Sequence, residues 1–169
     1  MKKILITTSS FAKDTPELLE SLRQHDFHII LNPIGRQLKE HELIDLLEQH
    51  RPVGLLAGTE PITRGTLDQS KKYLRVISRV GVGWDNVDRA SAAELGIHLF
   101  RTEGVLTQSV AELTMGLILA ALRRITAQDR AVRQHQWTKQ MGELLAGKTV
   151  GLIGFGDIGL RVGSLVRAF

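Results

Sequence analysis

The chain has 169 residues, 43% of them hydrophobic, which suits one ordinary domain or a small domain followed by part of another. Its 22 basic and 18 acidic residues are interleaved, so the net charge of +4 gives no concentrated basic surface for nucleic acid. The absence of cysteine excludes disulfides, thiolate metal sites and a cysteine nucleophile.

The N-terminus and the hydropathy pattern give no sign of a membrane protein. No apolar run reaches the roughly 18 to 20 residues of a spanning helix, and Met1-Lys2-Lys3 leads into a strand pattern instead of a signal-peptide core. We therefore expect a cytoplasmic protein without a membrane partner. The six histidines are scattered, with no pair at metal-ligand spacing on one element, so no metal site is expected.

The first hundred residues alternate between short apolar runs and helix-like stretches. The first helix is expected to start at Asp14-Thr15-Pro16-Glu17, where a capping side chain and an early proline precede an acid. Because parallel strands need crossovers, this alternation predicts a doubly wound, flavodoxin-like α/β domain over residues 1–103. The expected strands are 2–8, 27–31, 53–57, 75–80 and 97–100, and the later helices are 38–49, 65–70 and 89–95.

The pattern changes from Thr107 onward. Ser109 to Glu112 is typical of a capping box, and it predicts one long helix from Ser109 to about Ala127 that is apolar nearly all round, as in a helix wedged between two bodies. Residues 128–148 are mostly polar and are expected to form a linker or an arm around Trp137. A strand is then expected over Thr149 to Ile153, followed by a glycine turn and a helix from Asp157 to Phe169.

That turn contains Gly154-x-Gly156-x-x-Gly159 between a predicted strand and a predicted helix. In this context the glycines permit a tight turn, close approach of a pyrophosphate and close packing, so the motif favours a dinucleotide-binding site over an ordinary glycine-rich turn. The acidic residue that binds the adenine ribose is expected about 20 residues further on, beyond Phe169. The cofactor site is therefore expected to be only half present.

A second motif, residues 77–88, follows the fourth predicted strand, at the edge where open α/β sheets bind ligands. Gly81 and Gly83 could offer backbone amides to a small carboxylate. The alternative is purely structural: the glycines turn the strand, and Asp85, Asn86 and Asp88 cap the next helix. The sequence alone supports the ligand-binding and the structural interpretations equally.

Three successive segments, SRVGVGWDNVD, QSVAEL and VGLIGFGDIG, together resemble the D-isomer-specific 2-hydroxyacid dehydrogenases, closest to the phosphoglycerate-dehydrogenase-like branch. The resemblance implies a substrate domain (1–103) followed by the start of an NAD-binding Rossmann domain (104–169). It also implies a homodimer through the Ser109 to Ala127 helix and the Trp137 arm. By resemblance, Gly81, Val82 and Gly83 bind the carboxylate of a 2-hydroxyacid or 2-oxoacid, and NAD is held by Val82 and by Gly154, Phe155, Gly156, Asp157, Ile158 and Gly159.

The departures from the family pattern limit the function. The family's catalytic arginine, glutamate and histidine lie in the second half of its members, so none maps onto this chain, and no catalytic residue is expected here. Leu106 replaces a family asparagine, and Ala57-Gly58-Thr59 stands where phosphoglycerate enzymes carry arginines, so phosphoglycerate is not indicated as the substrate.

The leading hypothesis is therefore the truncated N-terminal part of an NAD-dependent dehydrogenase, inactive as it stands. The alternative is a non-catalytic binding or dimerisation module of the same fold, with a corepressor-type member as a third possibility. The choice of 2-hydroxyacid and of NAD or NADP stays open.

Overall fold

The computed structural model describes residues 1–8, 11–13 and 15–169. The chain divides into two compact units, Met1–Glu103 and Gly104–Phe169, and each is described by itself.

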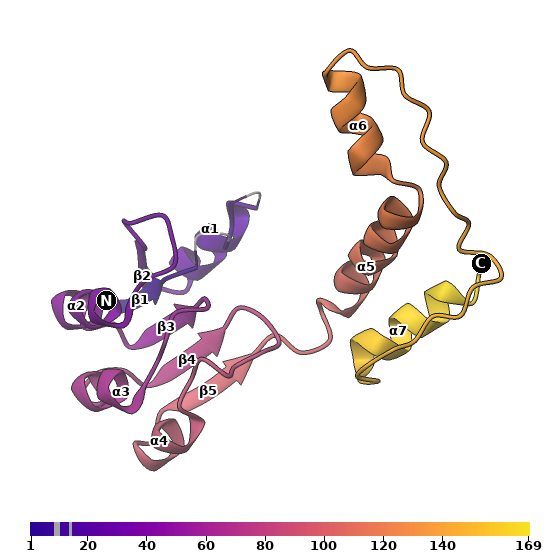
Figure 1. Ribbon diagram of the computed structural model, residues 1–169. Coiled ribbons are helices and arrows are strands. Elements are labelled where there is room, and N and C mark those ends of the chain that lie inside the picture. Colours follow the sequence, from indigo (N-terminus) through magenta and orange to yellow (C-terminus); the bar gives the residue numbers. More distant parts are fainter. Residues whose placement is uncertain (9–10, 14) are drawn as a thin grey trace. The chain divides into compact units, whose positions relative to one another are not determined.

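The first unit is a five-stranded parallel sheet with order β2-β1-β3-β4-β5. This is the flavodoxin-like order, so the predicted fold class is confirmed. Helices α2, α3 and α4 follow one another along one side of the sheet, whereas α1 lies on the other (Figure 1). The elements are β1 Lys2–Ile6, α1 Glu17–Gln24, β2 Phe27–Leu31, α2 Glu40–His50, β3 Gly54–Ala57, α3 Arg64–Ser70, β4 Val76–Arg79, α4 Arg89–Glu94 and β5 His98–Arg101.

The core of this unit lies between the sheet and the helices α2 to α4. Many of its largest fully buried apolar side chains come from the central strands and from these helices, and they include Leu5, Leu43, Leu47, Leu55, Leu67 and Ile77. Glycine ends α4, as predicted, because Gly96 adopts φ +68°, a conformation that favours glycine. The predicted cap Asp14 lies outside the described residues, and α1 begins directly after Pro16.

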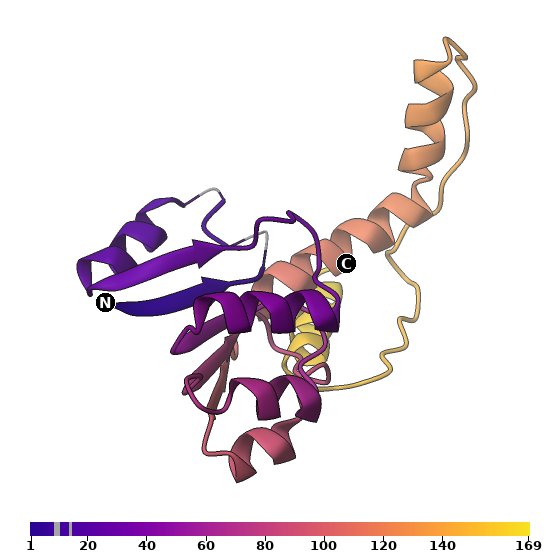
Figure 2. The same cartoon turned by 90° about the vertical axis from the view of Figure 1, so that its left-hand side faces the viewer.

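The second unit holds three helices, α5 Thr107–Leu122, α6 Ile125–Arg133 and α7 Asp157–Val166. The prediction of one helix from Ser109 to Ala127 is wrong, because the ribbon changes direction between α5 and α6 (Figure 2). Arg124 sits in the left-handed region with φ +54° and interrupts the helix. The Leu122 carbonyl accepts instead from the Glu143 amide at 2.9 Å, so the segment that returns along the arm takes the place of the next helical turn.

The start of α5 also differs from the prediction. The helix begins at Thr107 after Leu106 without a side-chain cap, and Glu112 accepts a hydrogen bond from the Gln108 side chain. The capping box predicted from Ser109 is therefore absent, because Ser109 lies inside the first helical turn and not before it.

The predicted strand over Thr149 to Ile153 does not form. In the part of the chain that the structure describes, this segment has no neighbouring strand to pair with, and the Ile153 side chain is fully exposed. The predicted helix after the glycine turn is confirmed as α7, which packs against α5 and buries Val162. Among the described residues, no helix combines the length and the hydropathy that crossing a membrane requires.

Candidate functional site

The loop that joins β4 to α4 is fixed at the carboxyl edge of the sheet by its two neighbours. The Val80 amide donates to the Ala57 carbonyl at 2.9 Å, and the Thr102 amide donates to the Gly81 carbonyl at 3.1 Å. The loop therefore starts between the ends of β3 and β5, where open parallel sheets bind ligands.

The backbone conformation at position 81 requires glycine. Its φ of +147° lies in the glycine region, and an added Cβ would collide with the Arg79 guanidinium. Its amide is engaged, donating to the Arg79 carbonyl at 2.9 Å and to Thr102 Oγ1 at 3.3 Å. Gly81 would have to leave these acceptors to bind a ligand, so its visible role is to shape the loop.

The next two amides differ from that of Gly81. Within the described residues, neither the Val82 amide nor the Gly83 amide has a protein acceptor, and Gly83 is exposed. A Cβ on Gly83 would meet only Asp85 Oδ2, at 3.8 Å. Two successive unpaired N–H groups at the carboxyl edge of a sheet are suited to an anion.

Trp84 follows the two unpaired amides, and two cations lie close to its ring. The Arg101 guanidinium is 4.3 Å and that of Arg89 is 5.0 Å from the centre of its ring, which are cation–π distances. Arg101 also donates to the Val82 carbonyl at 3.4 Å and pairs with Glu103 at 2.6 Å. The indole and the loop backbone are thus tied to the end of β5.

The polar residues that close the loop have structural partners. Asn86 donates through Nδ2 to the Glu60 carbonyl at 2.7 Å. Asp88 caps α4, accepting from the Ser91 amide at 3.0 Å and from its hydroxyl at 2.7 Å. These bonds, the backbone one first, hold the pKa of Asp88 below its ordinary value. The structural reading of Asp88 as a cap is therefore correct.

Glu60 is a buried acid that the sequence reasoning missed. Only 1% of the residue is exposed, and its Oε1 accepts from the Thr7 hydroxyl and, at 3.0 Å, from the Gly58 amide. The carboxylate therefore joins the ends of β1 and β3 beneath the loop. In the sequence, Glu60 is marked as an acid within three residues of the end of a buried strand. Arg101 is marked as an arginine at the end of β5.

The glycine turn of the second unit has the geometry of its motif. Gly154 has φ +89°, and a Cβ on Gly159 would collide with the Gly154 carbonyl, so both positions need glycine. Gly156 is the residue before α7 and has open space around it, and no side chain caps the helix. The first amides of α7 are consequently available to an anion.

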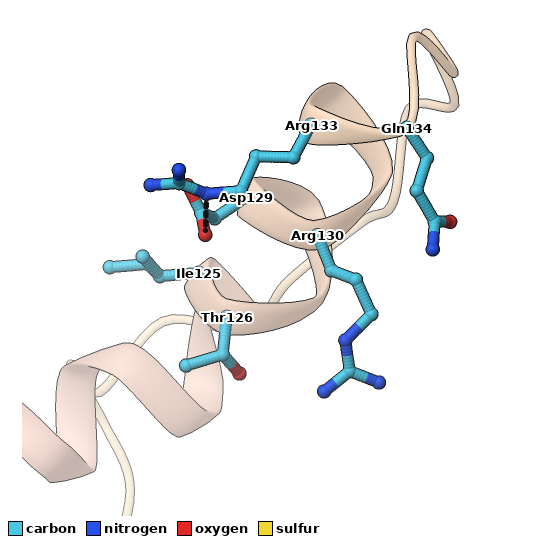
Figure 3. Close-up of a pocket in the computed structure, with 6 residues that line it drawn as sticks. All are labelled: Ile125, Thr126, Asp129, Arg130, Arg133 and Gln134. Carbon is cyan, nitrogen blue, oxygen red and sulfur yellow. Dashed lines mark hydrogen bonds and ion pairs between the residues drawn. The ribbon is translucent and has the colours of Figure 1, made fainter.

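Another surface recess lies along α6. It holds about 560 Å³ and is lined by Ile125, Thr126, Asp129, Arg130, Arg133 and Gln134. Figure 3 shows these side chains projecting from one helix and its end, with Arg133 paired to Asp129 at 2.8 Å. Small-molecule sites usually gather polar groups from several elements, so this recess is not the candidate site.

Comparison with known proteins points to one family. Residues 4–154 match the family described as D-isomer specific 2-hydroxyacid dehydrogenase, catalytic domain. The chain is similar to a D-3-phosphoglycerate dehydrogenase of Methanocaldococcus jannaschii, with 34% identity over 100% of this chain and 31% of the relative. It is similar to a glyoxylate reductase of Aeropyrum pernix, with 40% identity over 66% of this chain and 36% of the relative.

A solved structure agrees. The TT0316 protein of Thermus thermophilus superposes with a TM-score of 0.86 and 33% identity, covering 98% of this chain and 53% of that one. The chain thus spans about half the length of this structure and about a third of the two curated relatives.

Proposed function

Since the chain belongs to the D-isomer-specific 2-hydroxyacid dehydrogenase family, we propose that it supplies the substrate-binding part of an oxidoreductase that moves hydride between a D-2-hydroxyacid and NAD. Residues 1–103 are the substrate domain and residues 104–169 begin the NAD-binding domain. The proposed catalytic arginine, glutamate and histidine lie outside this chain, so the chain alone is expected to be inactive, and we place the protein in the cytoplasm.

The pair of unpaired amides on Val82 and Gly83 carries this proposal. A 2-hydroxyacid and its 2-oxoacid share a carboxylate next to the reacting carbon, and two aligned N–H donors fix such a group in one orientation. Gly81 belongs to the proposed carboxylate site through the loop conformation that it provides. Val82 then lies toward the nicotinamide side of the bound substrate.

NAD, when bound, accepts or gives the hydride, and this chain provides part of its site. The pyrophosphate is proposed to sit against the turn formed by Gly154, Phe155, Gly156, Asp157, Ile158 and Gly159, where the first amides of α7 are free. Gly156 has no side chain, and no atom lies within 4 Å of the position where a Cβ would be, which leaves room for that approach. Because these residues form only one side of a dinucleotide crevice, the isolated chain should bind NAD weakly.

We also propose that two copies associate through α5, α6 and the Trp137 arm. Leu113 and Leu117 are 62% and 61% exposed on α5, and Trp137 is 94% exposed. A group of exposed large apolar side chains is typical of a protein–protein contact surface. The recess along α6 belongs to the same proposed surface.

The proposed activity is tested by joining this chain to the remaining part of the Aeropyrum pernix glyoxylate reductase. NADH or NADPH oxidation is then followed with glyoxylate and with hydroxypyruvate, each with the 169-residue chain alone as reference. Turnover by the joined protein and none by the chain alone are expected. A folded joined protein without turnover on either substrate would contradict the proposal.

Gly83 provides a matched pair of variants for the same assay. Gly83→Ala keeps the amide and has room for its Cβ, so kcat/KM should stay within about threefold, while Gly83→Pro removes the donor and should lower kcat/KM about a hundredfold. Equal effects of both variants would show that the amide is not the binding group.

A further inference from the structure

Arg101, the last residue of β5, contacts the loop between β4 and α4, which carries the proposed carboxylate-binding amides. Its Nη1 donates to the Val82 carbonyl at 3.4 Å, its guanidinium lies 4.3 Å from the centre of the Trp84 ring, and Glu103 pairs with it at 2.6 Å. These three contacts hold the guanidinium in one place relative to the loop.

The Val82 carbonyl belongs to the same peptide unit as the Gly83 amide. Because the peptide is planar and trans, its C=O and N–H point in opposite directions. A donor that holds the carbonyl on the β5 side therefore turns the Gly83 N–H to the other side, where it has no protein acceptor in the part of the chain that the structure describes.

A second arginine contacts a carbonyl of the same loop two residues earlier. Arg79, which pairs with Arg101 in the register of β4 and β5, donates to the Val80 carbonyl. Alternate carbonyls of the loop, those of Val80 and Val82, are thus held by guanidinium groups. These two carbonyls belong to the same peptide units as the Gly81 and Gly83 amides. The contacts to the carbonyls therefore also orient the two amides.

We propose that Arg101 is a positioning residue that fixes the Val82–Gly83 peptide plane and so presents the Gly83 amide to the substrate carboxylate. This inference rests on the function proposed above. Its role is geometric more than electrostatic, because Glu103 neutralises the guanidinium charge and the contact to Val82 lies on the side of the peptide away from the proposed substrate.

Arg89 offers an internal control for this role. It lies over the same indole, at 5.0 Å, but it makes no hydrogen bond to a loop carbonyl within the described residues. A variant of Arg89 therefore removes a cation beside Trp84 without releasing the Val82 carbonyl. A variant of Arg101 removes both contacts.

The test uses the whole 169-residue chain, labelled with 15N and 13C, and oxamate as the carboxylate probe. The dissociation constant is read from the Gly83 amide cross-peak, and the Val82 carbonyl hydrogen bond is read from its 13C shift. Arg101→Gln should weaken oxamate binding about tenfold and move the Val82 carbonyl shift upfield, as expected for one lost hydrogen bond. Arg101→Lys keeps a donor and should restore binding to within about threefold, while Arg89→Gln should stay within about twofold of the wild type.

Equal oxamate affinity and an unchanged Val82 carbonyl shift in Arg101→Gln would overturn the positioning role. If the wild-type Gly83 amide does not respond to oxamate, the proposed substrate site fails, and the Val82 carbonyl shift still decides whether Arg101 holds the peptide. Should Arg101→Gln not fold, Glu103→Gln replaces it, since Glu103 is 68% exposed and outside the core. Its loosened guanidinium should weaken oxamate binding about threefold, and no change would count against the role.

Discussion

The two units of the chain differ in how they use their apolar residues. Among the residues that the structure describes, sixteen of the twenty buried apolar ones belong to Met1–Glu103, whereas fourteen of the nineteen large apolar ones that are exposed belong to Gly104–Phe169. The first unit covers its own sheet, while the second exposes apolar side chains on its helices and, in larger number, on the segments outside them. A unit of the first kind draws its stability from its own core, and one of the second kind depends on a surface that covers it.

The largest expected effect is a loss of folding stability when the core of the first unit is disrupted. Leu43 is fully buried in α2, so Leu43→Ala should lower the free energy of unfolding by about 2–5 kcal/mol through lost burial and a cavity. Leu113→Ala, at a 62% exposed position, should change it by less than about 0.5 kcal/mol in the monomer. Urea denaturation of both variants measures the contrast, and similar losses would mean that the two units are packed alike.

The next effect concerns association of the second unit. Leu117→Glu places a charge on an exposed apolar position of α5, and it should raise the dissociation constant of the proposed dimer about a hundredfold. Leu31→Glu makes the same change at an exposed leucine of β2 and should leave association unchanged. Sedimentation equilibrium gives both constants, and a wild-type chain that is monomeric at all concentrations would refute the proposed dimer.

A smaller effect tests a close backbone contact in the second unit, the one at Gly142. A Cβ at Gly142 would lie 2.8 Å from Arg123 Cα and from the Leu122 carbonyl oxygen, so Gly142→Ala should destabilise the arm by about 1–3 kcal/mol. Hydrogen exchange at the Glu143 amide reports this contact directly, and it should accelerate. Gly151→Ala, with no atom near its Cβ, is the control, and equal acceleration in both variants would show that crowding is not the cause.

The smallest effect is an acid dependence within the first unit. The Arg36 side chain first, then the Lys39 amide, lowers the pKa of Glu42 from 4.5 to about 2. A lowered carboxyl pKa stabilises the folded state above the unfolded pKa, and this contribution is lost as the pH falls from about 4.5 toward 2. Glu42→Gln should therefore be less stable than the wild type at pH 7, with a difference that shrinks in this interval.

Urea midpoints of the wild type and Glu42→Gln, taken from pH 7 down to pH 3, measure how this difference in stability shrinks. Glu20→Gln breaks an exposed pair with Arg23 on α1 and should change little at any pH. A Glu42→Gln difference that stays constant with pH would show that the carboxyl does not titrate differently in the folded state.

The sequence predicted the first unit well because its signals are local. Short apolar runs such as Phe27 to Leu31 match their strands, and Gly96 marks the end of α4 as expected. It predicted the second unit less well. The helix breaks at Arg124, and the Glu143 amide bonds to the Leu122 carbonyl, a contact between residues far apart in the chain. The segment 149–153 has strand-like composition, but a strand exists only with a partner.

The candidate site shows the same division. The glycines of both loops were visible as motifs, since their backbone roles leave a mark at their own positions. Arg101 and Glu60 act on other segments of the chain, and neither stands in a motif. The contact of Arg101 with Val82 depends on the register of β4 and β5, which no local pattern contains.

The bond between the Glu143 amide and the Leu122 carbonyl has an engineering consequence. It brings the two ends of residues 123–142 together, so α6 and the arm form a cassette whose entry and exit coincide. Inserting or deleting residues within such a closed excursion costs little in chain entropy and leaves its two anchor points in place. The length of the cassette can therefore diverge between relatives while α5 and the glycine turn keep their positions within the unit.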